Sequence, residues 1–416
     1  MARILVVRPS GSPFAVRMSK VLLEMVDLGH SVDIITPNVP PFRPNVPLEM
    51  GWDLAEQVRI ITAPCARDRE ARRTTRRILG TQLQPSGPFA QAIDERVGSG
   101  HYQVIWAKDS LVLPAVMAAA ERSPSRPRVV CDIYENAPQQ MVDRYIRFAS
   151  WRSALLTRVQ GLIPRLQAAE RRCFPQCDHL FTVVEEMADH LVETYGLDPQ
   201  RVSPVHNVER LADFDAIAPY RSSDKRPLVT YVGGIAGHRG LDTLIAAVPL
   251  LVKQLGSRFR VAIVGVRDDH RPMLQQELDE HNAQDVIELI PWCTHREAMG
   301  WIKGSAIGIV PHRATGHVAT TLPNKLFQYM SASVPVVCSD VGPLGRIPRE
   351  TGGGLAVQPD TPESLADAIA TLLASPDRAR KMGEAGRLAV EQTYCWAVQR
   401  SAYVDYLKGL DQCELA

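Results

Sequence analysis

A basic residue and two side-chain amides cluster at the start of a predicted helix in the second half of the chain. The letters are Leu322-Pro323-Asn324-Lys325, followed by Gln328. Proline suits the first helical turn, because its missing N–H costs nothing there. The unpaired N–H groups of a helix start, together with the charge of Lys325, favour an anion such as a diphosphate. Gln328 lies one turn after Asn324, so both side chains can face the same side.

A second group of this kind follows the apolar run Leu228–Val232, which predicts a buried strand. Gly233 and Gly234 come next and let the backbone approach a ligand closely. Arg239 stands a few residues later and can bind phosphate in a forked geometry. The alternative is a tight turn with a solvated cation. Lys325, as a second cation, favours the phosphate-binding interpretation.

The first half carries one comparable group, at the end of the predicted strand Val129–Asp132. Tyr134 and Glu135 follow this strand, and Glu135 can accept the proton of a hydroxyl group if its pKa suits. A helix-capping or surface carboxylate is the alternative. Ser10, Gly11 and Ser12 follow the first predicted strand, Ile4–Val7, and form a weaker candidate loop.

Composition sets the frame for these groups. The chain has 416 residues, of which 45% are hydrophobic and 22% charged, so we expect two large globular domains. The net charge of +1 gives no global signal for nucleic acid. No apolar stretch has the length of a membrane span, and Arg8 interrupts the apolar N-terminus, which argues against a signal peptide. The eight cysteines show no disulfide or metal spacing, which fits a cytoplasmic protein.

The elements that must position these residues follow a strand–helix–strand order in both halves. In the first half, Ile4–Val7, a helix over 15–28 and Val32–Ile35 form one such unit. In the second, Leu228–Val232, Leu241–Leu255 and Val261–Gly265 form another. This order predicts parallel sheets. We expect a first domain over 1–208, a linker over 209–226, a second domain over 227–395 and a C-terminal helix over 396–416.

Further predicted strands are 58–62, 104–107, 179–184, 286–290, 307–310 and 334–338, and further predicted helices are 273–281, 296–303, 365–374, 378–392 and 396–407.

The segment Pro323-Asn324-Lys325-Leu326-Phe327-x-Tyr329-Met330, followed by Pro335-Val336-Val337, resembles the donor-nucleotide helix of glycosyltransferase family 4. Tyr231-Val232-Gly233-Gly234 through Arg239-Gly240 resembles the glycine turn of the same family, and Asp132–Glu135 resembles its Asp-x-His-Glu strand end. The resemblance implies the GT-B fold: two Rossmann-like parallel-sheet domains facing a central cleft, with the C-terminal helix returning toward the first domain.

The resemblance also implies roles for residues of the second half. Arg239 and Lys325 would hold the donor diphosphate, and Gln328 the ribose, where the family has a second Glu. The wider sets are Gly233, Gly234, Leu322 and Asn324 for the diphosphate, Thr320 and Thr321 for the donor sugar, and Pro291, Trp292 and Arg267 for the base. Trp292 would either stack on the base or pack beneath its loop.

In the first half, Tyr134 and Glu135 would act on the reacting groups, and Ser10, Gly11 and Ser12 would line the acceptor side. The implied reaction moves a sugar from a nucleoside diphosphate sugar, expected to be UDP-linked, to an acceptor hydroxyl with retention of configuration. We expect no cofactor and no metal, on the premise that the chain contains no Asp-x-Asp cluster of the kind that metal-dependent glycosyltransferases use. The alternatives are a sugar-nucleotide epimerase of the same fold and a non-catalytic partner that binds a nucleotide sugar.

Two arginine-rich segments lie in the first half, Asp143–Arg172 and Arg67–Arg77. Arginines interleaved with aromatic and apolar residues are typical of helices that lie on anionic membranes. Peripheral membrane contact through Asp143–Arg172 would favour a lipid-linked acceptor. A solvated charged face is the alternative, and we expect no nucleic-acid partner.

Overall fold

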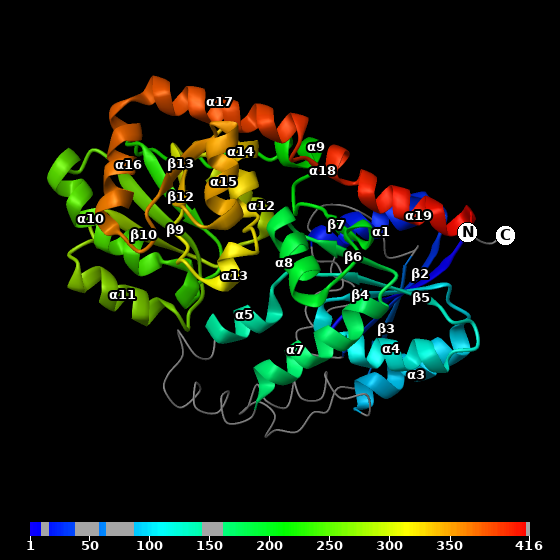
Figure 1. Cartoon of the computed structure of the whole chain (residues 1–416). Coiled ribbons are helices and arrows are strands. Elements are labelled where there is room, and N and C mark those ends of the chain that lie inside the picture. The colour runs from blue at the N-terminus through cyan, green and yellow to red at the C-terminus, as the bar shows by residue number, and fades with distance from the viewer. Residues whose placement is uncertain (10–15, 38–57, 64–86, 144–160, 413–416) are drawn as a thin grey trace. The chain divides into compact units, whose positions relative to one another are not determined.

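The protein divides into two compact units, each built on one parallel sheet (Figure 1). The computed structural model describes residues 1–9, 16–37, 58–63, 87–143 and 161–412. Unit 1 comprises residues 1–206 and 400–416, and unit 2 comprises residues 207–399. Residues 209–226, the expected linker, belong to unit 2 and contain helix α9 (Leu211–Asp215).

Unit 1 has a seven-stranded sheet in the order β3-β2-β1-β4-β5-β6-β7. Its strands are β1 (Arg3–Val7), β2 (Ser31–Pro37), β3 (Val58–Ala63), β4 (Val104–Lys108), β5 (Arg128–Asp132), β6 (His179–Thr182) and β7 (Val202–Pro204). Every residue of β4 is buried, as expected where helices cover both faces of a parallel sheet. Parallel register places Lys108 beside Asp132, so the ends of β4 and β5 lie together.

The helices of unit 1 are α1 (Val16–Asp27), α3 (Pro88–Gly100), α4 (Leu113–Arg122), α5 (Ala137–Val142), α7 (Leu162–Cys173), α8 (Glu185–Tyr195) and α19 (Ser401–Gln412). The last of these packs against α1, so the two ends of the chain meet in unit 1 (Figure 1). The single helix predicted over 396–407 is wrong in one respect, because Arg400 separates α18 (Trp396–Gln399) in unit 2 from α19.

Unit 2 has a six-stranded sheet in the order β10-β9-β8-β11-β12-β13. Its strands are β8 (Leu228–Val232), β9 (Arg260–Val266), β10 (Ile287–Pro291), β11 (Ile307–Val310), β12 (Val336–Ser339) and β13 (Gly354–Val357). Besides α9 and α18, its helices are α10 (Leu241–Leu255), α11 (Arg271–Glu280), α12 (His295–Lys303), α13 (Gly316–Ala319), α14 (Lys325–Ser331), α15 (Gly342–Thr351), α16 (Pro362–Ala374) and α17 (Pro376–Gln392).

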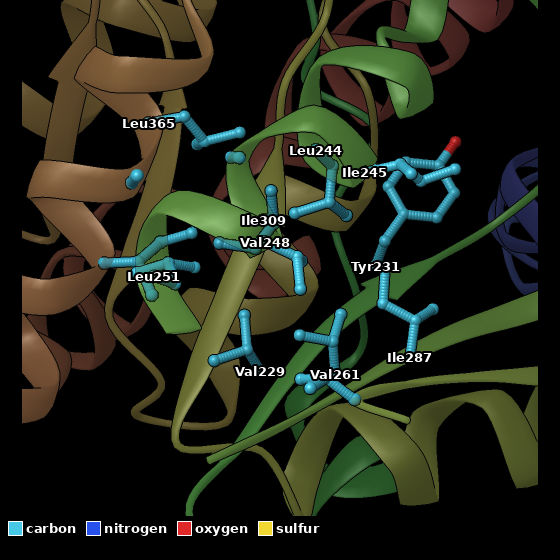
Figure 2. Packing of buried hydrophobic residues seen from close by; sticks show 14 of the residues in the cluster. Val229, Tyr231, Leu244, Ile245, Val248, Leu251, Val261, Ile287, Ile309 and Leu365 are labelled. Carbon is cyan, nitrogen blue, oxygen red and sulfur yellow. The ribbon is translucent and has the colours of Figure 1, made fainter. Parts of the chain in front are cut away.

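The core of unit 2 forms where α10 lies on the sheet (Figure 2). Leu244, Ile245, Val248 and Leu251 recur at helical spacing and are fully buried, which is why this stretch folds as an amphipathic helix. They pack with strand residues such as Val229. This packing holds β8, and therefore the glycine turn that follows it, in a fixed position.

Candidate functional site

The glycine turn after β8 lies against the Lys325 side chain. Gly233 has φ +138°, a conformation that residues with a side chain rarely adopt, and its N–H donates to the Val264 carbonyl at 3.0 Å. A Cβ atom at Gly233 would lie 3.0 Å from Lys325 Nζ. The backbone conformation and the closeness of the Lys325 side chain therefore both favour glycine at this position.

Two cations meet at this turn, and no carboxylate of the described residues pairs with either of them. Lys325 is 6% exposed, and its ammonium nitrogen, 3.7 Å from the ring centroid of Tyr231, has no hydrogen-bond partner among the described residues. Arg239 Nη1 donates to the Gly234 carbonyl at 3.0 Å. Burial, and then repulsion by Arg239, holds the pKa of Lys325 well below its usual range. A buried ammonium group beside a half-buried guanidinium favours the binding of an anion.

Arg313 fixes the segment that carries Arg239. Its backbone N–H donates to the His238 carbonyl at 2.9 Å, and its Nε to the Gly237 carbonyl at 3.1 Å. The guanidinium also forms ion pairs with Asp242 and Asp360. Arg313 thus holds the segment of Arg239 in place and itself forms the ion pairs with the two nearby carboxylates.

Three histidines, which the sequence analysis did not single out, lie around these cations. The His238 ring is 5.9 Å from that of His312 and 5.5 Å from that of His317, centroid to centroid. Burial first, and then the charges of Lys325 and Arg239, holds the pKa of His312 well below its usual range. No local motif marks these residues, because they come from three separate segments.

Gln328, the predicted ribose ligand, faces a carboxylate that the sequence analysis also missed. Its Nε2 donates to Glu209 Oε1 at 2.7 Å, and the two residues are only 8% and 4% exposed. Glu209 lies 119 positions away, so no local pattern could have paired them. The structure therefore places the carboxylate of Glu209 directly beside the amide of Gln328.

The hydroxyl groups of Thr320 and Thr321, the predicted sugar ligands, bond to the preceding turn. Thr320 Oγ1 donates to the Gly316 carbonyl at 3.0 Å, and Thr321 Oγ1 to the His317 carbonyl at 2.7 Å. Leu322 is buried, and Asn324 precedes α14 without a side-chain capping bond. The helix begins at Lys325 rather than at Pro323 and has seven residues, so the side chains carry more of the anion-binding argument than the helix start does.

The predicted base-binding residues gather at the ends of β9 and β10. The Trp292 side chain is exposed, with 66% of the residue's surface accessible, and its backbone N–H donates to the Val266 carbonyl at 3.0 Å. The Arg267 guanidinium carbon lies 5.7 Å from the Trp292 ring centroid, and Pro291 is exposed beside them. The alternative that Trp292 packs beneath its loop is therefore wrong, and an aromatic face remains open to a ligand.

In unit 1, Tyr134 and Glu135 follow β5, next to the end of β4. The Tyr134 ring contacts the Lys108 ammonium, and the Arg17 guanidinium carbon lies 4.7 Å from its centroid. Lys108 is buried, and Lys108 Nζ and the Tyr134 hydroxyl have no hydrogen-bond partner within the described parts of the chain. Ser10, Gly11 and Ser12 lie outside the described residues.

Asp109 is the most unusual residue of this group, and the sequence analysis did not identify it. Its φ of 82° is strained for a residue with a side chain, and Oδ1 is buried with no hydrogen-bond partner in the described structure. Burial raises the pKa of Asp109 to about 6; Lys108 opposes this rise and Glu135 adds to it. Strain and an unsatisfied carboxylate oxygen are typical of functional sites.

A second buried carboxylate nearby has a structural role. Asp132 is completely buried and accepts from Arg17 Nη2 at 3.0 Å. The Tyr403 hydroxyl lies 3.2 Å from both Asp132 oxygens. The Asp132 carboxylate is therefore paired and hydrogen-bonded within unit 1.

The premise about Asp-x-Asp was wrong, because Asp213-Phe214-Asp215 is such a triplet. In the structure it lies in α9, where Asp215 pairs with Arg387 at 2.7 Å and Asp213 with Arg210 at 3.4 Å. Within the described residues, no three histidine, cysteine or carboxylate side chains are grouped so as to hold a metal ion. The triplet thus serves ion pairs of unit 2.

The arginine-rich segments are only partly described. Arg67–Arg77 and residues 144–160 lie outside the described residues, and α7 carries Arg165, Arg171 and Arg172. No helix in the described part of the chain is long and apolar enough to cross a membrane.

Two family models together match most of the chain. Residues 15–208 match Glycosyltransferase Family 4, and residues 214–389 match Glycosyl transferases group 1. The boundary between the two matches falls close to the boundary between the units.

Curated relatives match part of the chain. A D-inositol 3-phosphate glycosyltransferase of Streptomyces bingchenggensis is 26% identical over 58% of this chain and 55% of its own length. An alpha-maltose-1-phosphate synthase of Mycolicibacterium smegmatis is 28% identical over 55% of this chain and 62% of its own length. The matched stretch thus spans little more than half of these relatives.

Solved structures match over the whole length. Sucrose-phosphate synthase from Thermosynechococcus elongatus has a TM-score of 0.78 at 17% identity, covering 100% of this chain and 99% of that one. Anabaena HepE in complex with UDP-glucose has a TM-score of 0.69 at 12% identity, covering 98% and 100%. The chain is therefore a member of the GT-B glycosyltransferases, similar to glycosyltransferase family 4.

Proposed function

We propose that this protein transfers a sugar from a nucleoside diphosphate sugar to an acceptor hydroxyl, with retention of configuration and without a metal ion. The observation that carries the proposal is the pair of cations at the Gly233 turn, the buried Lys325 and the half-buried Arg239, for which the described structure shows no carboxylate partner. Departure of a nucleoside diphosphate builds negative charge, which two preorganised cations stabilise. Two fixed cations do the work that a metal ion does in metal-dependent transferases.

The remaining donor contacts follow from the same unit. Trp292 offers an exposed aromatic face for a base, with Arg267 beside it. Gln328 gives its amide N–H to Glu209, so its amide oxygen can accept a bond from a ribose hydroxyl. The similarity to HepE, whose structure holds UDP-glucose, supports a uridine donor.

For the acceptor, we propose a small polyhydroxy compound that meets Tyr134, Glu135 and Asp109 at the strand ends of unit 1. The unsatisfied Tyr134 hydroxyl and Asp109 oxygen, with Lys108 beside them, provide both donors and acceptors for hydroxyl groups. The names of the relatives, which include D-inositol 3-phosphate and sucrose phosphate, support a phosphorylated polyol.

A lipid-linked acceptor is the second class, and it rests on the arginine-rich segment Asp143–Arg172. Co-sedimentation with vesicles of anionic and of neutral lipids separates the two classes. Salt-sensitive binding to anionic vesicles alone supports the lipid-linked acceptor. Absence of binding at low salt contradicts it.

Calorimetry with EDTA-treated protein and a panel of UDP-, GDP-, ADP- and dTDP-sugars tests the donor. We expect one nucleotide to bind, and its affinity to fall at least about tenfold in Arg239→Ala and Lys325→Ala. Lys381→Ala, on the exposed side of α17, is the matched control. Lack of binding by the whole panel contradicts the proposal.

Turnover with the bound donor tests the reaction itself. An NMR spectrum of the product distinguishes a new glycosidic bond from an epimerised nucleotide sugar. A product with the anomeric configuration of the donor is expected. Donor binding without turnover across candidate acceptors would favour the non-catalytic alternative.

A further inference from the structure

The diphosphate site of unit 2 contains more potential positive charge than Lys325 and Arg239 alone provide. His238 lies in the single-turn segment Gly237–Arg239, His312 follows β11, and His317 lies in α13. The His238 ring lies within 6 Å of both other rings, centroid to centroid. Each of these segments also borders the strand ends that carry the predicted donor ligands.

His312 is the histidine whose surroundings call for a ligand. It is 5% exposed, and its Nε2 is buried without a hydrogen-bond partner among the residues that the structure describes. Unsatisfied buried polar atoms of this kind require an explanation. There are two of them here, His312 Nε2 and Lys325 Nζ, and the charge of Lys325 acts on His312.

The charges that act on His312 are all positive. Lys325 of α14, Arg239 and His238 of the segment before α10, and His317 of α13 all lower its pKa, after burial itself. The carboxylates next to this region, Asp242 and Asp360, are ion-paired with Arg313. Without an anion, the imidazole is therefore held neutral.

An anion in the site reverses this balance. A diphosphate carries two negative charges at neutral pH, and opposite charges within a few ångströms favour the protonated form of a histidine. We propose that His312 takes up a proton when the donor diphosphate binds and then acts as a third positive group on that diphosphate. This proposal rests on the proposed donor site and deepens it.

The consequence concerns the reaction as well as binding. When the bond between the sugar and the diphosphate breaks, its electron pair stays on the phosphate oxygen, and the leaving group gains negative charge. An imidazolium that is already in place stabilises this charge more than it stabilises the intact donor. His312 is therefore a binding residue that stabilises the departing diphosphate more strongly than it stabilises the intact donor.

The pH dependence has a defined sign. The pKa of His312 is low in the free protein and rises on binding, so the bound state holds more protons. Affinity for the donor is then highest below the pKa of His312 in the free protein. It falls as pH rises from that value to the pKa in the complex, by up to about tenfold per pH unit for one proton, and is constant above it. A nucleotide sugar is the correct probe, because its diphosphate is a diester without a titration step near neutrality.

Isothermal titration calorimetry of the full chain measures the proton directly. The nucleotide sugar that binds in the panel, expected to be UDP-glucose, is titrated in PIPES, MOPS and Tris at one pH. These buffers differ in their ionisation enthalpy, so the slope of the observed enthalpy against it is the number of protons taken up. We expect net uptake of a substantial fraction of one proton between about pH 6 and pH 8.

Substitutions assign the proton to a residue. His312→Gln keeps an N–H near the Nε2 position but cannot titrate, so the uptake is expected to fall while binding remains measurable. Lys325→Arg keeps a permanent charge and removes the other group whose pKa is depressed. His281→Asn, at the end of α11, is the matched control and should leave the uptake unchanged.

Each outcome decides the proposal. Loss of uptake in His312→Gln with uptake retained in Lys325→Arg supports it. Donor binding without proton uptake overturns it and leaves the proposed function standing. Uptake that persists in His312→Gln, or disappears only in Lys325→Arg or His238→Asn, overturns the assignment to His312. Failure of every nucleotide sugar to bind is a different result, because it overturns the proposed function itself.

Discussion

At the scale of single residues, the burial of Lys325 lowers the stability of the fold, so folding alone does not explain why a lysine stands there. A buried ammonium group without a partner loses hydration and gains no hydrogen bond, which is unfavourable by a few kcal/mol. Proteins accept such costs where a ligand supplies the missing partner. Stability and binding should therefore respond in opposite directions when the charge is removed.

Replacing Lys325 with Met should stabilise the protein and abolish donor binding. We expect a gain of roughly 1–2 kcal/mol, because an unpaired buried amine is replaced by an apolar chain of similar length. Differential scanning calorimetry and donor titration measure the two effects. Lys303→Met is the control: its Nζ donates to the carbonyls of Phe214 and Asp215 at 3.2 and 3.0 Å, so stability should fall and donor binding persist. A destabilised Lys325→Met that still binds donor contradicts this account.

Asp109 should make stability depend on pH. Its pKa is raised to about 6 by burial, above the value near 4 of an unfolded chain. Its protonated form is therefore favoured in the fold, and stability is highest below about pH 4 and is lost as pH rises through about 6. Asp109→Asn should raise the free energy of unfolding at pH 8 by on the order of 2 kcal/mol and leave it unchanged near pH 4. Melting temperatures of the variant and the parent at the two pH values measure this difference.

The control for this pH effect is Asp94→Asn, because Asp94 pairs with Arg122 on the surface of unit 1. This variant should not show the difference between pH 8 and pH 4. Glu170, whose pKa burial raises to about 7, retains a dependence of the same sign in both variants. Equal effects of Asp109→Asn at both pH values would exclude a buried, destabilised carboxylate.

At the scale of elements, the site depends on how closely α14 approaches the sheet. The ring of Tyr329 lies over Gly308 of β11, where a Cβ atom would overlap it, and the Tyr329 hydroxyl donates to the Thr230 carbonyl of β8 at 2.8 Å. These contacts fix the helix that carries Lys325 and Gln328. The missing side chain of one glycine thereby sets the position of two candidate ligands.

Gly308→Ala should lower stability and donor affinity together. Overpacking of this kind typically costs about 1–3 kcal/mol, and relief requires α14 to move away from the sheet. Thermal unfolding and donor titration report the two effects. Gly98→Ala in α3 is the control, because no atom lies within 4 Å of its added Cβ; it should leave donor affinity unchanged and raise stability by up to about 1 kcal/mol through helix propensity. Full donor affinity in a destabilised Gly308→Ala would separate α14 from the site.

At the scale of the whole molecule, the chain forms unit 1 from both of its ends. Residues 400–416 return to unit 1 after unit 2 is complete, and α19 packs against α1 (Figure 1). Tyr403 of α19 reaches the buried pair Arg17 and Asp132, with its hydroxyl 2.5 Å from Arg17 Nη2. The stability of unit 1 therefore depends on residues that follow unit 2 in the sequence.

Tyr403→Phe should destabilise unit 1 and spare the donor site of unit 2. Loss of a hydrogen bond to a buried charge costs about 1.5–3 kcal/mol. Hydrogen exchange resolved by segment should show faster opening in β5 and α1, with donor affinity unchanged. Tyr406→Phe is the control on the same helix, since its hydroxyl lies near Arg128 and Asp178 and not in the pair of Arg17 and Asp132. Uniformly faster exchange in both units would contradict this account.

Much of the fold could be predicted from local patterns. The apolar runs at 228–232 and 307–310 became β8 and β11 with the predicted bounds, and the helix at 241–255 became α10. Boundaries failed where tertiary contacts intervened. The strand expected from Val334 begins at Val336, because the Val334 N–H bonds back to the Tyr329 carbonyl after Ser333 turns the chain at φ 56°.

The sequence by itself determined the parallel α/β architecture of both halves and the pair Arg239 and Lys325, because strand periodicity, glycine turns and short motifs are local properties. Only the tertiary structure decided that Glu209 faces Gln328, that Lys108 lies against Tyr134 and Asp109 near Glu135, and that three histidines gather near the cations. These neighbours come from distant segments. Their proximity is set by the sheet order, and their charges become informative only once burial removes water from around them.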